Sequence, residues 1–193
     1  MSGIAELVSP QSGHFLLESG FHGNLWLDLE ALFLRPERIA PPALELSRRL
    51  AQYGAEVVCG PLVEGAFLAL MVARQMNLPF TYSERFLRDD ARSLYPFGYR
   101  IPSPLHPHVR GKRAVVVNDV IGGGSAVGGT WEELEVRGGI PVAIGALLVV
   151  GEWTSRFAGE RKIGAESLES MTSDLWTPGE CPLCARREPL VRP

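Results

Sequence analysis

Residues 114–125 of the chain, AVVVNDVIGGGS, constrain the fold more than any other stretch. Ala114 to Val117 are small or β-branched and apolar, as in a strand that is buried on both faces of a parallel sheet. Asn118-Asp119 and three consecutive glycines, Gly122 to Gly124, come next, and residues 126–137 have a helix-like pattern. Fixing three glycines is entropically costly. This order therefore indicates that the backbone itself has a task at the turn.

The glycine turn predicts a phosphate site. Ligands of open α/β sheets bind at the carboxyl ends of the strands, and backbone N–H groups at a helix N-terminus attract anions. Asn118 and Asp119 would stand beside the turn, where a carboxylate accepts sugar hydroxyls and helps to hold Mg²⁺. An ordinary glycine-rich turn is the alternative, because the spacing matches neither the Walker loop nor the G-x-G-x-x-G pattern.

The rest of the chain alternates between apolar strands and helical segments, which favours a parallel sheet with right-handed crossovers. The strands are expected at 55–61, 78–84, 113–119 and 140–151, the helices at 42–53, 65–77 and 126–137, an extended pair at 14–33 and a short return strand at 97–102. We therefore expect an α/β fold with an open, mostly parallel twisted sheet flanked by helices. Its parts would be a small N-terminal hood (1–35), an α/β core (36–151) and an irregular C-terminal appendage (152–193).

Composition excludes several classes of protein. The 193 residues are 46% hydrophobic with a formal charge of -3 and no block of like charges, so neither nucleic acid nor a membrane is expected as a partner. The longest apolar stretch is shorter than the ~20 residues of a membrane span. Three cysteines and the absence of a signal-like start predict a cytoplasmic protein without a disulfide framework.

The glycine stretch also resembles the phosphoribosyl pyrophosphate signature of type I phosphoribosyltransferases. Three more stretches resemble orotate phosphoribosyltransferases in the same order: LLESGFHGNLWLDLEALF their hood, VVCGPLVEGAFLAL their first strand and diphosphate loop, and FTYSERF the start of their flexible loop. The resemblance covers residues 13 to about 150. It implies a Mg²⁺-dependent enzyme that transfers phosphoribosyl from phosphoribosyl pyrophosphate to a nucleobase, with orotate as the leading acceptor, and that forms a homodimer.

The resemblance also implies roles for individual residues. Asn118 and Asp119 would hold the ribose hydroxyls, and Arg85 and Arg88, with Asp119, would be the catalytic side chains. The 5′-phosphate would lie on Gly122, Gly123, Gly124, Ser125 and Ala126, the diphosphate on Leu62, Val63, Glu64 and Gly65, and the base on Trp26.

Several residues depart from the family pattern and keep alternatives open. Asn118 replaces an acid, Glu18 stands where orotate enzymes usually have a lysine, and Tyr82-Ser83 replaces a basic pair. These departures motivate two rivals: a non-catalytic nucleotide-binding or phosphoribosyl-binding regulator, and a phosphoribosyltransferase for a purine or another base. Arg85, Arg88 and Arg92 alternate with acids, so an exposed salt-bridged loop competes with a catalytic lid.

Cys181 and Cys184 form a C-P-L-C pair, half of a structural zinc site. A second chain, or His106 or His108, would have to supply the other two ligands; two packed or surface thiols are the alternative. Cys59 reads as a core residue. His22 reads as a solvated residue of the hood turn.

Overall fold

The computed structural model describes residues 3–17, 20–29, 32–87 and 97–192. Helices and strands alternate along most of this chain. In order they are α1 (Ile4–Leu7), β1 (Gln11–Leu16), β2 (His22–Trp26), α2 (Pro36–Leu50), β3 (Val57–Pro61), α3 (Glu64–Met76), β4 (Phe80–Leu87), β5 (Phe97–Arg100), α4 (His106–Val109), β6 (Arg113–Ile121), α5 (Ser125–Val136), β7 (Ile140–Val150), α6 (Trp153–Arg161), β8 (Gly164–Met171), β9 (Leu175–Trp176) and α7 (Pro182–Ala185).

The central sheet of the described residues has six strands in the order β5-β4-β3-β6-β7-β8. All neighbours are parallel except β5, which returns antiparallel to β4. Residues 114–117 of β6 are fully buried, as expected for a strand covered on both faces. The predicted α/β class and mostly parallel sheet are confirmed.

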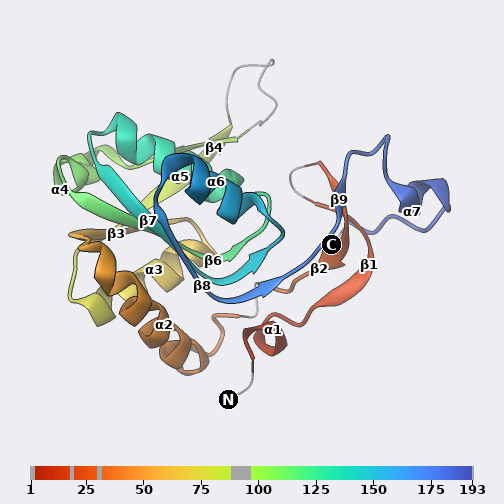
Figure 1. The fold of residues 1–193 in the computed structure, drawn as a ribbon, viewed down its shortest axis with the longest axis horizontal. Helices are drawn as coiled ribbons and strands as arrows, with labels where there is room; N and C mark the ends of the chain where they lie inside the picture. Colours follow the sequence, from red (N-terminus) through yellow and green to blue (C-terminus); the bar gives the residue numbers. More distant parts are fainter. Residues whose placement is uncertain (1–2, 18–19, 30–31, 88–96, 193) are drawn as a thin grey trace.

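Helices cover both faces of this sheet (Figure 1). One core cluster packs α2 and α3 against the sheet through residues such as Leu46 and Leu68. The other packs α5 and α6 against the opposite face through Trp131, Leu134 and Phe157. The glycine turn after β6 therefore leads into a helix that is anchored by a buried apolar stripe.

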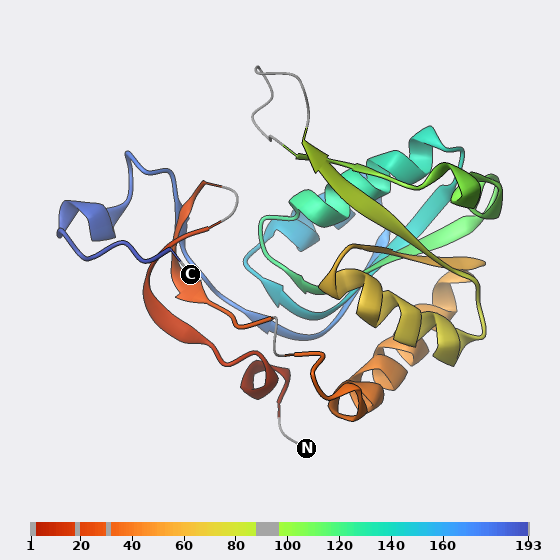
Figure 2. The ribbon, with the colours of Figure 1, turned by 180° about the vertical axis from the view of Figure 1, so that it is seen from behind.

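A second, three-stranded sheet among the described residues forms the hood, in the order β1-β2-β9. β2 pairs antiparallel with both β1 and β9. The chain runs from the end of β8 almost directly into β9, so the hood stands beside the carboxyl edge of the central sheet (Figures 1 and 2). The two sheets thus flank the edge where an α/β fold binds its ligands.

Two predicted boundaries differ from the structure. The first long helix begins at Pro36 rather than at residue 42, because Pro36 takes the first helical position and the fully buried Ile39 anchors the first turn. Pro41 and Pro42 lie inside it.

Residues 152–193 were expected to be an irregular appendage, yet α6 and β8 belong to the central α/β unit, and β9 completes the hood. The two strands of this region, β8 and the two-residue β9, lack the apolar alternation that identifies a strand in a sequence.

Candidate active site

The turn between β6 and α5 is open above its first two glycines. A Cβ built on Gly122 or Gly123 meets no atom within 4 Å. Gly124 has a φ of +75°, and a Cβ there would strike the Trp153 ring, so only glycine fits this position. α5 has no side-chain cap, and the first N–H groups of a helix have no partner within it. The backbone geometry therefore suits an anion.

The turn between β3 and α3 lies next to the glycine turn, because β3 and β6 are neighbouring parallel strands. A Cβ on Gly65 would collide with Oδ1 of Asn118, so the first turn of α3 is in close contact with the end of β6. The N–H of Leu62 donates to the carbonyl of Ser83 at 2.9 Å and is therefore not available to a ligand. Of the four backbone amides that were predicted to bind diphosphate, those of Val63, Glu64 and Gly65 at the start of α3 therefore remain as donors.

The two polar residues of β6 behave differently. Asn118 is half-buried and its amide Nδ2 donates to the carbonyl of Val120 at 2.7 Å, which fixes the direction of its Oδ1. Asp119 is 3% exposed, and its Oδ2 has no hydrogen-bond partner among the described residues. Burial, with a smaller contribution from the charge of Glu64, raises the pKa of Asp119 to about 7. A buried carboxyl oxygen with no partner is suited to accept a ligand's hydroxyl groups.

The other predicted site residues are more dispersed. Ser125 is exposed at the first position of α5. The Arg85 guanidinium lies 4.4 Å from the centroid of the Phe97 ring, across the β4–β5 pair. Trp26 belongs to β2 of the hood, where its ring is tilted against Phe15 at 6.2 Å. Glu18, Arg88 and Arg92 lie outside the described residues.

A cavity of about 350 Å³ borders the glycine turn. Gly123, Gly124 and Ser125 form one side of it, and aromatic and basic side chains of β5 and α6 form the other: Phe97, Tyr99, Trp153, Phe157 and Arg161. A larger cavity of about 630 Å³ lies between α1, α2 and β8 and is lined by none of the predicted site residues. Of these two cavities, the smaller adjoins the anion-binding turn.

Three contributors to this site could not be recognised from the sequence. The ring of Trp153 supports Gly124, the charge of Glu64 acts on Asp119, and Ser83 occupies the N–H of Leu62. Each of these contacts is between residues of different helices and strands, so no local sequence pattern predicts it. The sequence carried one usable signal, the acidic side chain at Glu64, which lies among the residues predicted to bind diphosphate through their amides.

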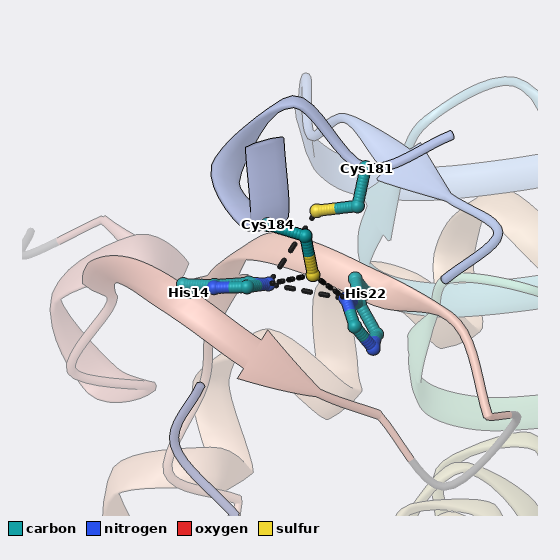
Figure 3. A group of neighbouring side chains, drawn as sticks. All are labelled: His14, His22, Cys181 and Cys184. Carbon is teal, nitrogen blue, oxygen red and sulfur yellow. Dashed lines mark hydrogen bonds between the residues drawn. The ribbon is translucent and has the colours of Figure 1, made fainter. Parts of the chain in front are cut away.

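A separate polar cluster lies in the hood. His14 and His22 gather with Cys181 and Cys184, all four ligand atoms within 4.8 Å of one another (Figure 3). His22 was expected to be a solvated turn residue, but it is 5% exposed. His106, one of the two histidines proposed as partners of the cysteines, instead contacts the carbonyl of Ile101 at 2.8 Å. Cys59 is fully buried, as predicted.

The solved structures most useful for comparison are phosphoribosyltransferases. Orotate phosphoribosyltransferase from Aeropyrum pernix aligns with a TM-score of 0.65 and 21% identity over 87% of this chain and 91% of that one. Adenine phosphoribosyltransferase from Thermoanaerobacter pseudethanolicus aligns with a TM-score of 0.59 and 15% identity over 76% of this chain and 88% of that one. The sheet order, the hood and the glycine turn thus define a fold of the type I phosphoribosyltransferase class.

Sequence relatives narrow this class. Orotate phosphoribosyltransferase of Caldanaerobacter subterraneus subsp. tengcongensis is 31% identical over 183 residues, 94% of this chain and 88% of the relative. That of Desulforamulus reducens is 30% identical over 184 residues, with the same coverage. No family model matches the chain. The chain belongs to the orotate phosphoribosyltransferase family and is a phosphoribosyltransferase enzyme. Every helix among the described residues is too short or too polar to cross a membrane.

Proposed function

We propose that the protein transfers the 5-phosphoribosyl group from phosphoribosyl pyrophosphate to orotate, giving orotidine 5′-monophosphate and diphosphate. The open glycine turn beside Oδ2 of Asp119, which has no partner among the described residues, is the observation that carries the proposal in a member of this family. In the reaction a ring nitrogen of the base loses its proton to solvent and bonds to C1 of the ribose, while the C1–O bond to diphosphate breaks. The leaving oxygen keeps the electron pair.

The glycine turn would hold the 5′-phosphate. The bare amides of Gly122 to Ala126 and the exposed hydroxyl of Ser125 are the donors, and the positive end of the α5 dipole adds attraction. Because no Cβ occupies the space above Gly122 and Gly123, the phosphate oxygens can approach the backbone closely. A phosphate fixed there anchors C1 for attack and so lowers the entropic part of the barrier.

Asn118 and Asp119 would bind the ribose hydroxyls. Oδ2 of Asp119, which is buried and has no hydrogen-bond partner among the described residues, is the acceptor that we assign to them. Oδ1 of Asn118, directed toward Gly65, would stand between the ribose and diphosphate positions. Accepting these hydroxyls also concentrates negative charge near the ring, which favours a transition state with positive charge on C1.

The diphosphate would lie at the start of α3. The amides of Val63 to Gly65 are the donors at this position, and Arg85 with Arg88 would neutralise the leaving group. We propose a Mg²⁺ ion bound mainly by the diphosphate. The residues fit such an ion, since two carboxylates are present: the pKa of Asp119 is raised mainly by burial and further by the negative charge of Glu64. When bound, the ion offsets the charge that develops on the departing diphosphate.

The base would lie between the glycine turn and the hood, with Trp26 as its aromatic platform. We further propose a cytoplasmic homodimer. Three unbridged cysteines suit a reducing compartment, and the exposed Phe67 and Leu70, three residues apart on α3, supply apolar surface for a second copy.

The proposal is tested by measuring diphosphate release with phosphoribosyl pyrophosphate, Mg²⁺ and a panel of bases. We expect turnover with orotate and none with adenine, guanine or uracil. If only a purine supported turnover, the proposed acceptor would be that purine and not orotate. Calorimetric binding of the donor without release for any base would instead favour a non-catalytic binding protein, and no binding of the donor at all would remove the phosphoribosyl site.

Gly123→Ala tests the phosphate site without disturbing the fold. The new methyl group meets no protein atom within 4 Å, but it stands where the phosphate would approach. We expect the KM for phosphoribosyl pyrophosphate to rise about tenfold or more with an unchanged Tm. Gly159→Ala, at an exposed position of α6 that is equally open, is the matched control. An unchanged KM in Gly123→Ala would show that the 5′-phosphate does not bind at this turn.

A further inference from the structure

Four side chains that bind metals converge in the hood from two distant parts of the chain. His14 lies on β1 and His22 on β2, whereas Cys181 immediately precedes α7 and Cys184 lies within it (Figure 3). His14, His22 and Cys181 are at most 5% exposed, and Cys184 is exposed. Three ligands are thus shielded from water, while the fourth leaves a path by which an ion can enter.

The spacing of the ligand atoms fits a tetrahedral ion. Nε2 of His14 lies 3.1 Å from Nδ1 of His22, 3.4 Å from Sγ of Cys181 and 3.7 Å from Sγ of Cys184. Sγ of Cys184 is also 3.3 Å from Nδ1 of His22. A tetrahedral zinc ion with ordinary Zn–N and Zn–S bonds separates its ligand atoms by about 3.3–3.8 Å. Small shifts would therefore bring the cluster to the metal-bound geometry.

Hydrogen bonding alone does not account for the cluster. Nδ1 of His14 lies 2.9 Å from the carbonyl of Glu188, which can only accept, so Nδ1 carries the proton. Nε2 then offers a single lone pair to three neighbouring groups, and a hydrogen bond satisfies only one of them. A cation at the centre satisfies the imidazoles and both thiolates together. A carbonyl that orients the outer nitrogen of a histidine is the usual second layer of a metal site.

The hood needs such a link, because it has little core of its own. None of the described residues in 11–26 or 172–192 belongs to either hydrophobic cluster of the protein. Among the described residues, the backbone joins the two chain ends here only through β2–β9 and the contacts of Val191 with His14 and Leu16. Small units with so little apolar burial are commonly stabilised by a metal or a disulfide.

We propose that His14, His22, Cys181 and Cys184 bind one Zn²⁺ ion within a single chain. All four positions are filled by protein, which makes the site structural rather than catalytic. Binding releases the two thiol protons and fastens α7 and the C-terminal segment to β1 and β2. The site is independent of the proposed transfer reaction, and its test does not rely on turnover.

The first test measures metal in the full-length protein, purified without a polyhistidine tag. We expect about one zinc per chain after dialysis, and about one equivalent of Co²⁺ bound by the stripped protein. The cobalt form should show the strong visible bands of a tetrahedral site and a thiolate-to-cobalt charge-transfer band. A wild-type protein that holds no zinc and takes up neither ion would overturn the proposal. So would a cobalt spectrum without thiolate bands.

Variants then identify the ligands. Cys184→Ser and His22→Ala should each retain less than about a tenth of the zinc, and removal of zinc by a chelator should lower the wild-type Tm. Cys59→Ala and His108→Ala are the matched controls, since neither residue belongs to the cluster, and both should keep a full equivalent. Undiminished zinc in Cys184→Ser, or a Cys181–Cys184 disulfide in the freshly purified protein, would contradict the site. Because the cobalt titration uses the wild-type chain, a variant that fails to fold does not weaken the test.

Discussion

Asp119 is a carboxyl group that the fold keeps almost entirely out of water. Its side chain is 3% exposed, Oδ2 has no hydrogen-bond partner among the described residues, and Glu64 adds negative charge nearby. Such a group destabilises the empty protein when it is ionised. The same features make it a strong acceptor once hydroxyl groups reach it. The buried carboxylate therefore lowers the stability of the empty protein but strengthens the binding of a ligand with hydroxyl groups.

This arrangement predicts a pH-dependent stability. The pKa of Asp119 is raised from 3.8 to about 7, so between these pH values the folded protein retains a proton that the unfolded chain has released. This contribution is therefore full below about pH 4, declines as the pH rises to about 7 and is level above it. Asp119→Asn cannot ionise. Its stability relative to wild type should increase between pH 4 and pH 8 by about 4 kcal/mol.

Urea unfolding of both proteins across this pH range measures the effect. Comparing the change with pH, rather than one value, cancels any constant cost of burying the new amide. Parallel stability curves for the two proteins would show that Asp119 has an ordinary pKa. Orotate turnover should fall in the same variant, because the acceptor of the ribose hydroxyls is weakened.

At the level of residues, sequence reasoning found what the backbone does and missed what distant side chains do. Gly122 to Gly124 and Asp119 could be recognised because strand, turn and helix follow one another directly in the chain. The opposing ring of Trp153, and the gathering of His14 and His22 with the two cysteines, depend on tertiary packing. The distances between residues that are far apart in the chain cannot be read from the sequence.

Among the elements, β4 connects the two turns of the candidate active site. The backbone carbonyl of Ser83 accepts a hydrogen bond from the N–H of Leu62. The side-chain hydroxyl of Ser83 lies 2.6 Å from the hydroxyl of Thr130 on α5. Thr130 also donates to the carbonyl of Ala126 at 2.8 Å. Both hydroxyl-bearing residues are completely buried. Ser83 on β4 therefore fixes the position of the turn between β3 and α3 relative to α5.

Removal of this link should be costly. Thr130→Val preserves volume but leaves the buried Ser83 hydroxyl without its partner, and we expect the free energy of unfolding to fall by about 1–3 kcal/mol. Thr130→Ser keeps the hydroxyl and is the control for the altered shape. A double-mutant cycle with Ser83→Ala should return a coupling energy above about 0.5 kcal/mol. Additive effects would mean that the two hydroxyls act independently.

Most elements of the central sheet could be predicted because their own sequences specify them. The apolar runs of β3, β6 and β7 identify these strands, and the length and apolar composition of α3 identify this helix, without reference to neighbours. β8 could not be found in this way, because it is a half-buried edge strand whose place is set by pairing with β7. The start of α2 was missed for a related reason, since burial of Ile39 outweighs the helix-breaking tendency of Pro41 and Pro42.

At the scale of the whole molecule, residues 152–192 contribute both to the α/β unit and to the hood. Phe157 and Ala158 of α6 are buried, with Phe157 in one core cluster, and β8 covers the edge of β7. β9 and α7 complete the hood. The predicted division at Gly151 therefore falls within the α/β unit, and the chain changes from core to hood after Met171.

Two truncations distinguish these divisions. A chain that ends at Gly151 exposes the edge of β7 and part of the core, so we expect it to aggregate. A chain that ends at Met171 retains the six described strands of the central sheet. It should unfold cooperatively in urea, while the amides of β1 and β2 exchange their hydrogens much faster than in the full-length protein. A well-behaved 1–151 fragment would restore the simpler division.

The hood joins β1 and β2 to β9 and α7, so it can form only after residues far apart in the chain have been synthesised. Cys181 lies 167 positions after His14. At ribosomal speeds of roughly 5–20 residues per second, the first strands wait on the order of ten to thirty seconds for their partners. Only a chain that has been synthesised as far as Cys184 can close the hood, so chains released earlier would carry loose, protease-sensitive β1 and β2 strands.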